Sequence, residues 1–265
     1  MITERYALDR SLVDQFGRDG HVVLRGVASA EEVESVRPAI QLGAMTLRHE
    51  TRPLQERDTY GRAFIQSCNI WQVEKDVERF VLAPRFGALA AALLEVERVR
   101  IYHDQALFKE PGGGRTPWHQ DEFYWPLDTE KTVTMWMPLH DVTAETGLMS
   151  FADGSHRLGD LRGREISDRS EAEFAALVDE QGLNVPATPA LAAGDATFHA
   201  GWTLHCAGAN ETEAVREAFT VIFFADGARL REPRNGYERF DAAMWLPGVE
   251  VGELAASSIN PVAGI

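Results

Sequence analysis

The sequence predicts an α+β protein, mainly β, because helix-like segments come first and strand-like segments follow them. Apolar residues recur at helical spacing in two early stretches, residues 29–40 and 76–95. From Val99 onward the pattern changes to short runs in which apolar and polar residues alternate, with turn-forming segments between them. This order of elements favours a domain whose β region closes on itself.

The first helical segment has a clear start signal. Ser29 followed by Glu32 is typical of a capping box, in which each side chain bonds the other residue's backbone N–H. Pro38 lies inside the helical pattern and predicts a kink or an early break, because proline has no backbone N–H to donate. The second stretch, residues 76–95, is divided by Pro84. We therefore expect one capped helix and then a divided one.

Alternation and turn residues predict the strands. The expected strands cover residues 99–108, 132–139, 147–152, 196–199 and 218–225. A shorter β-like run at residues 21–25 follows an amphipathic patch at residues 12–16. We expect a single domain over residues 1–265, made of a helical N-terminal region (residues 1–96), a barrel (residues 97–230) and a tail (residues 231–265). A polar insertion at 158–186, with a short helix at 171–178, interrupts the barrel.

Composition limits the partners of the chain. Its 265 residues are 45% hydrophobic, enough for a sizeable core, and its formal net charge is −15. Such an acidic surface argues against nucleic acid and against anionic membranes as partners. The apolar runs are too short to span a membrane, and no secretory signal is recognisable. Two cysteines, Cys68 and Cys206, cannot build a disulfide framework, so we expect a cytoplasmic protein.

The most informative segment is TPWHQDEFYW, residues 116–125, because it places His119 two residues before Asp121. On a strand, residues i and i+2 point to the same face, so this imidazole and carboxylate can converge on one ion. Two histidines and one carboxylate on one face of an octahedron are a known site for non-haem Fe(II). A lone His-x-Asp can equally be a polar surface turn, although the flanking aromatic residues indicate a lined pocket.

A second histidine must come from elsewhere in the chain. His199 and His205 both follow Gly194-Asp195, and both fall near an expected strand. Chemistry alone does not choose between them. Three more histidines fit structural roles better: His103, His140 and His156.

Several motifs in the same order resemble the phytanoyl-CoA dioxygenase family. They are WHQD at residues 118–121, Trp136 within TMWMPL, GSHR at residues 154–157 and GDATFHAGWTLHCAGAN at residues 194–210. The resemblance extends over residues 20–225. It implies a double-stranded β-helix, which is a jelly-roll, cupin-like barrel with N-terminal helices packed on it. It also implies Fe(II) as cofactor and 2-oxoglutarate and O₂ as co-substrates.

The resemblance assigns roles to particular residues. His119, Asp121 and His205 match the metal ligands, and His199 matches an upstream histidine that does not usually bind the metal. Arg216, eleven residues past His205, matches the arginine that holds the distal carboxylate of 2-oxoglutarate. A planar guanidinium suits this role because it can bind a carboxylate through two hydrogen bonds. Without the resemblance, Arg216 would be interpreted as a surface residue of a charged turn.

Four more residues are candidates for the co-substrate pocket, although ordinary barrel packing would explain each of them as well: Gln105, Lys109, Thr134 and Trp136. A substrate lid is expected from four residues that precede the barrel: Phe64, Gln66, Asn69 and Trp71. One departure from the family pattern stands at Ala207, where a serine that helps to hold 2-oxoglutarate is expected. Asp121 is retained, which argues against halogenation.

These features predict an iron- and 2-oxoglutarate-dependent oxygenase that hydroxylates a C–H bond of a small molecule or natural-product intermediate. The same site could perform desaturation, cyclisation or epimerisation, because the substrate radical has several fates. The sequence is also compatible with a catalytically silent cupin-like binding protein and with a non-redox zinc enzyme. The acidic composition and the absence of a Lys/Arg cluster argue against an acyl-CoA substrate and favour bacterial secondary metabolism.

Overall fold

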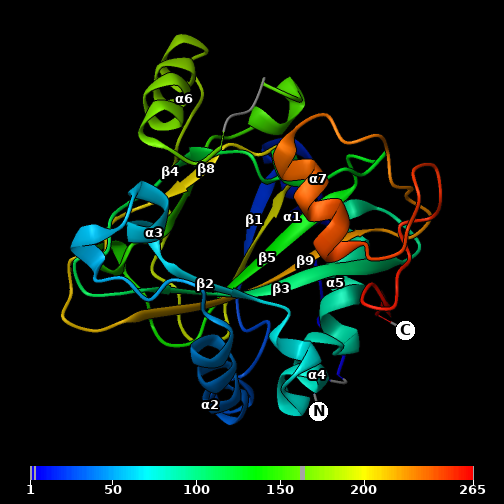
Figure 1. Ribbon diagram of the computed structural model, residues 1–265, viewed down its shortest axis with the longest axis horizontal. Helices are drawn as coiled ribbons and strands as arrows, with labels where there is room; N and C mark the ends of the chain where they lie inside the picture. Colours follow the sequence, from blue (N-terminus) through cyan, green and yellow to red (C-terminus); the bar gives the residue numbers. More distant parts are fainter. Residues whose placement is uncertain (1, 3, 162–164, 265) are drawn as a thin grey trace.

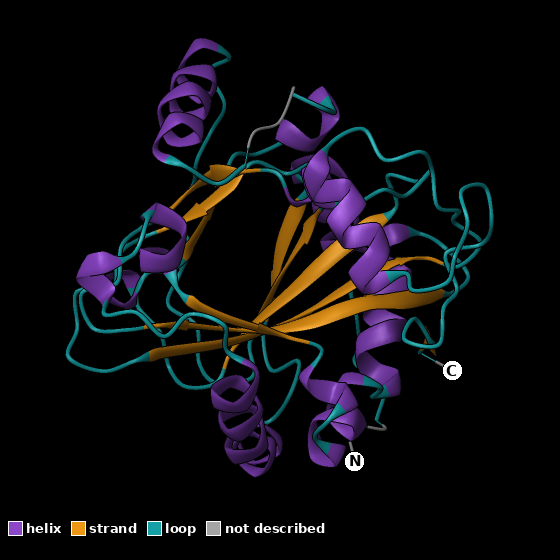
Figure 2. Cartoon of the chain, in the orientation of Figure 1, coloured by secondary structure: helices purple, strands orange, loops and turns teal. Residues whose placement is uncertain are grey.

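The strands form two antiparallel sheets that face each other (Figure 1 and Figure 2). The computed structural model describes residues 2, 4–161 and 165–264. The large sheet has the order β1-β7-β5-β9-β3-β10, with β2 also paired to β3, and the small sheet has the order β4-β8-β6. The strands of the large sheet are His21–Leu24 (β1), Ile65–Cys68 (β2), Val99–Lys109 (β3), Thr132–Pro138 (β5), Ala196–Ala200 (β7), Arg216–Ala225 (β9) and Val262–Ala263 (β10). Those of the small sheet are Thr116–His119 (β4), Met149–Phe151 (β6) and His205–Ala207 (β8). This arrangement confirms the predicted mainly-β fold with a double-stranded β-helix.

The barrel extends beyond the predicted range, residues 97–230. Strands β1 and β2 lie in the predicted helical region, residues 1–96, and β10 lies in the predicted tail, residues 231–265, yet all three join the large sheet. The β-like run predicted at residues 21–25 is β1, whereas β2 and β10 have four and two residues, too few for a clear alternation of apolar and polar side chains. Residues 1, 3, 162–164 and 265, which belong to the predicted N-terminal region, insertion and tail, lie outside the described residues.

Four helices cover the outer face of the large sheet and enclose the main hydrophobic core with it. They are Arg10–Asp19 (α1), Ala30–Leu47 (α2), Lys75–Val81 (α4) and Pro84–Leu94 (α5). The predicted capping box of Ser29 and Glu32 is present, and Pro84 begins α5 as the sequence indicates. The predicted break at Pro38 is wrong, because α2 continues through it. Burial of its apolar face against the sheet outweighs the cost of the lost hydrogen bond, about 3 kcal/mol.

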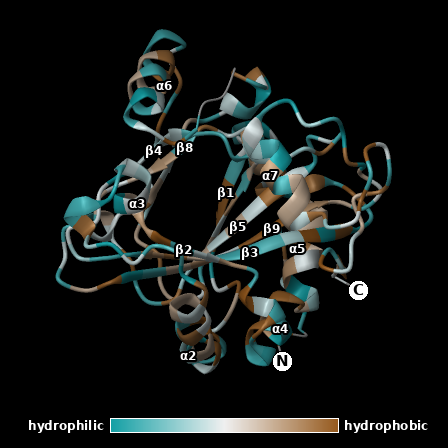
Figure 3. Ribbon diagram, in the orientation of Figure 1, coloured by the Kyte–Doolittle hydropathy of each residue, from teal (hydrophilic) through white to brown (hydrophobic). Residues whose placement is uncertain are grey.

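The remaining helices lie away from the outer face of the large sheet (Figure 1). Helix α6, Asp168–Glu180, packs on β4 through Phe174 and Val178 and is longer than the predicted 171–178. Helices α4 and α6 carry both hydrophobic and hydrophilic bands, as expected of helices that pack on one side only (Figure 3). The other two helices are Thr59–Ala63 (α3) and Gly236–Trp245 (α7). Short 3-10 helices cover Leu54–Glu56 (η1), Ile70–Gln72 (η2), Asp121–Tyr124 (η3), Ala144–Thr146 (η4) and Ser155–Leu158 (η5). Among the described residues, no helix is long and apolar enough to cross a membrane.

A buried carboxylate joins β3 to the segment that follows β2. Asp104 is fully buried beside an irregularity in the β3–β9 register. Its two oxygens accept the backbone N–H groups of Ile70 and Trp71, each at 2.9 Å. Burial raises the pKa of Asp104 to about 7, although the two N–H groups oppose the shift. The carboxyl group is therefore protonated in the folded protein at pH values where it is ionised in the unfolded chain.

This shift predicts a pH-dependent stability. Above about pH 5 the unfolded state has lost the proton that the folded state keeps until pH approaches 7, so the contribution of Asp104 to stability falls as pH rises from 5 to 8. Relative to Asp104→Asn, which does not titrate, the wild-type protein should lose on the order of 2–3 kcal/mol across this range. Urea denaturation of both proteins at several pH values measures this difference. A difference that stays constant with pH would contradict the assignment.

Candidate metal centre and co-substrate site

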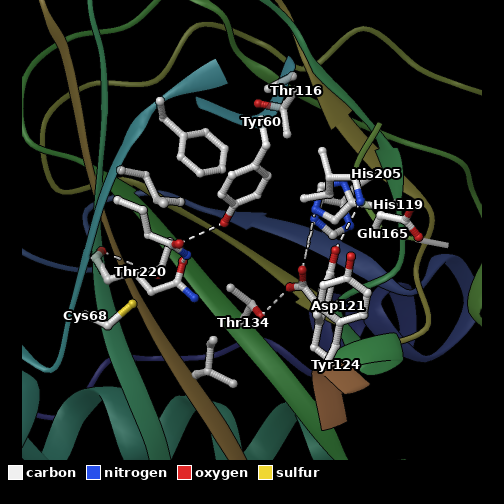
Figure 4. A pocket seen from close by; sticks show the side chains of 18 of the residues that line it. Tyr60, Cys68, Thr116, His119, Asp121, Tyr124, Thr134, Glu165, His205 and Thr220 are labelled. Carbon is white, nitrogen blue, oxygen red and sulfur yellow. Dashed lines mark hydrogen bonds and ion pairs between the residues drawn. The ribbon is translucent and has the colours of Figure 1, made fainter. Parts of the chain in front are cut away.

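A cavity of about 780 Å³ lies between the two sheets. The large sheet contributes side chains of β2, β3, β5, β7 and β9, and the small sheet those of β4, β6 and β8. Helices α3 and α7 and residues 165–169 complete the wall. Figure 4 shows His119, Asp121 and His205 gathered on one side of the cavity. The candidate site is therefore inside the barrel, where both sheets can supply functional groups.

His119 and His205 face each other across the small sheet. They are register partners in the β4–β8 pair, and their ring centroids are 4.0 Å apart. The Nδ1 atom of His119 is 2.7 Å from the carbonyl oxygen of Pro117, and that of His205 is 2.9 Å from the carbonyl oxygen of Thr203. A carbonyl accepts only from N–H, so each Nδ1 carries the proton and each Nε2 has a free lone pair.

Asp121 lies in the segment that follows β4, and its carboxylate faces the Nε2 atoms of both histidines. Its Oδ1 atom is 3.5 Å from Nε2 of His119 and 3.6 Å from Nε2 of His205. One donor atom from each of the three residues lies within 4.8 Å of the others, as the ligands of one ion must. The prediction that His119 and Asp121 share a strand is wrong, because β4 ends at His119 and Asp121 begins η3. The turn still brings the carboxylate back to the imidazoles.

The electrostatics of the cluster favour the forms that bind metals. Burial and the neighbouring His119 and His199 lower the pKa of His205 well below its usual value, so its imidazole is neutral. Burial alone would raise the pKa of Asp121, but the surrounding histidines, His205 foremost, hold it well below its ordinary range. A neutral imidazole and an ionised carboxylate are the states that can donate electron pairs to a cation.

His199 lies beside the cluster but contacts the other carboxylate oxygen. It is on β7 of the large sheet, and its Nε2 atom is 3.2 Å from Oδ2 of Asp121. Thr134 of β5 donates its hydroxyl to the same Oδ2 at 2.9 Å (Figure 4). The Nδ1 atom of His199 has no hydrogen-bond partner among the described residues. Oδ2 is thus held by two side chains of the large sheet, and Oδ1 is left to face His119 and His205.

Arg216 begins β9 and is almost completely buried, so its interpretation as a surface residue of a charged turn is wrong. Its guanidinium carbon lies 5.3 Å from the ring centroid of Trp136, and both side chains line the cavity. Its Nε and Nη1 atoms have no hydrogen-bond partner among the described residues. Burial lowers the pKa of Arg216 to about 10, which leaves it charged at neutral pH. Buried, charged and unpaired N–H groups beside a cavity fit an anionic ligand.

Lys109 is a second buried cationic side chain and lies beside Arg216. It is the register partner of Arg216 in the β3–β9 pair and is fully buried. Its Nζ donates to the carbonyl oxygen of Gly114 and, at 3.4 Å, to the hydroxyl of Thr116. Burial, together with Arg216, lowers the pKa of Lys109 to about 7. Lys109 is not among the lining residues of the cavity, and its ammonium points to this loop while Arg216 reaches the cavity; the predicted role of Lys109 in binding the co-substrate stays a prediction.

Gln105 lies on the cavity wall within a chain of hydrogen bonds. The hydroxyl of Tyr60 donates to Oε1 of Gln66 at 2.8 Å, and Nε2 of Gln66 donates to Oε1 of Gln105 at 3.2 Å. Gln66 and Phe64 line the cavity, as expected of the predicted lid residues. Asn69 and Trp71 do not, because the indole N–H of Trp71 bonds the side chain of Asn69. That half of the lid prediction is wrong.

Several lining residues carry no signal in the sequence. His103, assigned there to structure, lines the cavity, and so do aromatic residues of α7: Tyr237, Phe240 and Trp245. The predicted insertion also contributes residues 165–169. Aromatic residues are common in cores, and nothing local distinguishes those that face a cavity. His140 and His156 stay outside the cavity lining, in agreement with their structural interpretation.

Comparison with known proteins agrees with this site. The phytanoyl-CoA dioxygenase (PhyH) family profile matches residues 16–218. The chain is 29% identical over 216 residues to a probable alpha-ketoglutarate-dependent hypophosphite dioxygenase of Stutzerimonas stutzeri, covering 78% of this chain and 74% of that protein. It is also similar to the structure of SnoK, a non-heme alpha ketoglutarate dependent carbocyclase from nogalamycin biosynthesis, with 26% identity, 97% of each chain covered and a TM-score of 0.78. The epimerase SnoN, in complex with Fe³⁺, alpha ketoglutarate and nogalamycin RO, matches with 27% identity, 96% of this chain, 97% of that chain and a TM-score of 0.78.

The fold and the buried cluster define an oxygenase of the non-haem, iron- and 2-oxoglutarate-dependent class. Iron and 2-oxoglutarate (alpha-ketoglutarate), predicted as cofactor and co-substrate, are the requirements of that class. Because the profile covers most of its length, the chain belongs to the phytanoyl-CoA dioxygenase family. The predicted fold, family and enzyme class are therefore confirmed.

Proposed function

We propose that His119, Asp121 and His205 hold the iron of this oxygenase. The observation that supports it most strongly is the convergence of two Nε2 lone pairs and one carboxylate oxygen, Oδ1 of Asp121. This donor set suits Fe(II), since imidazole and carboxylate together make the facial triad of such enzymes. The carbonyl groups of Pro117 and Thr203 fix the tautomer and the orientation of the two rings.

Arg216 is the residue that would hold 2-oxoglutarate by its distal carboxylate. Its unpaired Nε and Nη1 atoms match the geometry of a carboxylate, and Trp136 packs on its guanidinium. Lys109, behind it, adds positive charge without reaching the cavity. When bound, iron and 2-oxoglutarate supply the oxidation of a C–H bond by O₂, with conversion of 2-oxoglutarate to succinate and CO₂. The chain orients both and keeps water away from them by burial.

The rest of the cavity favours a neutral, aromatic or polycyclic substrate with hydroxyl or carbonyl groups. Its wall is rich in aromatic rings and carries the amide groups of Gln66 and Gln105, which can bond neutral oxygens. Apart from Arg216, the arginine among the described lining residues is Arg169, which pairs with Glu173. Among the described lining residues, a phosphate-bearing acyl-CoA therefore finds no unpaired cationic side chain besides Arg216, which favours a substrate of natural-product chemistry.

Hydroxylation is the outcome we propose first, and cyclisation or epimerisation is the second. The second is favoured by the likeness over nearly the whole chain to SnoK, a carbocyclase, and SnoN, an epimerase. All three outcomes begin with removal of hydrogen from a C–H bond of the substrate. All three outcomes therefore require the same proposed roles: iron held by His119, Asp121 and His205, and 2-oxoglutarate held by Arg216.

Iron-dependent formation of succinate tests the proposed function. Purified protein supplied with Fe(II), 2-oxoglutarate and O₂ should form succinate, and a neutral polycyclic phenol or quinone that fits the cavity should increase the rate. An acyl-CoA of similar apolar size should not increase it. Failure to form succinate under any of these conditions would contradict the proposal, and stimulation by the acyl-CoA alone would contradict the substrate class.

Thr134 is expected to position the metal ligand Asp121. Thr134→Val removes the hydroxyl that donates to Oδ2 but keeps the shape of the side chain. Loss of such a supporting bond should lower Fe(II) affinity by roughly tenfold. Thr220→Val is a matched control, because Thr220 also lines the cavity but does not contact Asp121. Anaerobic Fe(II) titrations of both variants measure the effect, and equal affinities would argue against this role.

A further inference from the structure

A bulge in β3 directs two neighbouring side chains toward helix α7. The β3–β9 register shifts between Ile101 and Asp104, so two residues of β3 oppose one residue of β9. Such a bulge breaks the alternation of a strand and changes the direction of its side chains. The two residues are Tyr102 and His103, whose ring centroids are 5.2 Å apart. Both contact α7, which lies beside β3 (Figure 1).

Helix α7 turns one face toward the cavity. Residues three or four apart lie on one side of a helix, and four such residues line the cavity: Tyr237, Phe240, Asp241 and Trp245. Asp241 is buried, and the hydroxyl of Tyr102 donates to its Oδ2 atom at 3.1 Å. The ring centroid of Trp245 is 4.8 Å from that of His103, which also lines the cavity. The bulge and the helix thus place a carboxyl group and an imidazole on one part of the cavity wall.

Both groups can accept a hydrogen bond from a ligand in the cavity. The Nδ1 atom of His103 is 3.3 Å from the carbonyl oxygen of Asp104, so Nδ1 carries the proton and Nε2 keeps a lone pair. Burial lowers the pKa of His103 to about 4, which leaves the ring neutral. A carboxylate has about four acceptor positions, and the hydroxyl of Tyr102 occupies one of those of Asp241.

Asp241 has no cationic partner among the described residues. The side chains that act on its pKa are Tyr102, Trp245 and Glu238, and none of them is a cation. Burial raises the pKa of Asp241 to about 7, although Tyr102 and Trp245 oppose the shift. A buried carboxyl group with spare acceptor positions favours a ligand that donates to it, because unpaired polar groups are costly to bury.

We propose that Asp241 and His103 determine substrate specificity by accepting hydrogen bonds from a hydroxyl group of the substrate, with Asp241 as the main acceptor. The inference rests on the proposed function, because it places the substrate in the cavity beside the metal centre. It narrows the substrate class to polycyclic compounds with a hydroxyl group on the edge that faces α7. A carbonyl or ether oxygen there cannot donate to either acceptor. Because the hydroxyl fixes the orientation of the substrate, Asp241 and His103 also decide which C–H bond faces the iron.

Anaerobic titration of the protein loaded with Fe(II) and 2-oxoglutarate tests this role at about pH 8, where the carboxyl group of Asp241 is mostly ionised. The probes are 2-naphthol and 2-methoxynaphthalene, which share their rings but differ in whether the oxygen can donate a hydrogen bond. The wild-type protein should bind 2-naphthol about tenfold more tightly than the ether. Asp241→Leu should bind both probes equally. His103→Phe keeps a ring against Trp245 and should reduce the preference to about threefold.

Glu165→Leu is the matched control, because it removes another carboxyl group from the cavity wall. It should keep the full preference for 2-naphthol, and loss of the preference there as well would overturn a specific role of Asp241. A third probe, the ammonium form of 2-naphthylmethylamine, tests the charge of the ligand. Tighter binding of this cation than of 2-naphthol would assign Asp241 to an amino group and overturn the hydroxyl assignment.

Thermal melting establishes that each variant is folded. An unchanged preference in Asp241→Leu or in His103→Phe overturns the role of that residue. If Asp241→Leu does not fold, a crystal structure of the wild-type protein with 2-naphthol decides, and a naphthol oxygen away from Asp241 overturns the inference. Equal binding of the two naphthalenes by the wild-type protein, or no binding of either, also overturns it. Iron-dependent succinate formation, measured separately, distinguishes the two failures: if succinate forms, only this inference fails, and if none forms, the proposed function fails as well.

Discussion

Alanine at His205 is expected to lower Fe(II) affinity by about a hundredfold or more and to abolish succinate formation. The substitution removes one of three ligand atoms and leaves Asp121 and His119 to hold the ion alone. The imidazole of His205 is buried and neutral, the form that donates an electron pair to a cation. Anaerobic Fe(II) titration followed by metal analysis measures the loss.

His199 supplies the matched control for this prediction, since it is a buried histidine in contact with the same carboxylate. Its Nε2 atom faces Oδ2 of Asp121, so we expect it to support the ligand and not to bind the metal. The variant His199→Gln keeps a side-chain N–H donor and should cost tenfold or less in Fe(II) affinity. If His199→Gln lost more Fe(II) affinity than His205→Ala, His199 and not His205 would be the metal ligand.

Replacement of Arg216 by methionine is expected to have opposite effects on binding and on stability. Arg216→Met removes two charged donors from the carboxylate of 2-oxoglutarate, which should raise its Kd by about a hundredfold. The same change removes a buried charge whose N–H groups have no partner among the described residues. The free energy of unfolding should therefore rise by about 1–2 kcal/mol.

Melting curves with and without 2-oxoglutarate measure both effects. The wild-type, Fe(II)-loaded protein should gain Tm when 2-oxoglutarate is added, and Arg216→Met should not, because a ligand stabilises only the state that binds it. Arg231→Met is the contrasting variant, since Arg231 forms two 2.7 Å bonds with the fully buried Glu238 and its loss leaves that carboxylate with fewer cationic partners, Arg234 being the one that remains. Destabilisation of Arg216→Met to the same extent as Arg231→Met would show that Arg216 has a structural role.

The sequence predicts the regions of the fold that have strong local patterns. The capping box of Ser29 and the alternation after Val99 correspond to α2 and β3, because each pattern specifies one backbone conformation. The barrel limits and the effect of Pro38 are not predictable in this way. Strands of two to four residues have no clear period, and packing against the sheet decides whether a helix tolerates a proline.

The candidate site, too, is only partly predictable from the sequence. The spacing of His119 and Asp121 suggests a shared ligand role, although their contact arises from a turn after β4 and not from one strand face. Local chemistry does not choose between His199 and His205; the family motif indicates His205, and the three-dimensional arrangement adds which carboxylate oxygen each ring meets. The grouping of His103 with Asp241 is visible only in three dimensions, because it joins β3 to α7, which are far apart in the sequence.

The central claim is that iron lies between Nε2 of His119, Oδ1 of Asp121 and Nε2 of His205. A crystal structure of the Fe(II)-loaded protein, with anomalous diffraction recorded at the iron absorption edge, tests it most directly. We predict one anomalous peak in contact with these three atoms, with His199 bound only to Oδ2 of Asp121. A peak coordinated by His199 in place of His205, or located away from Asp121, would contradict the claim.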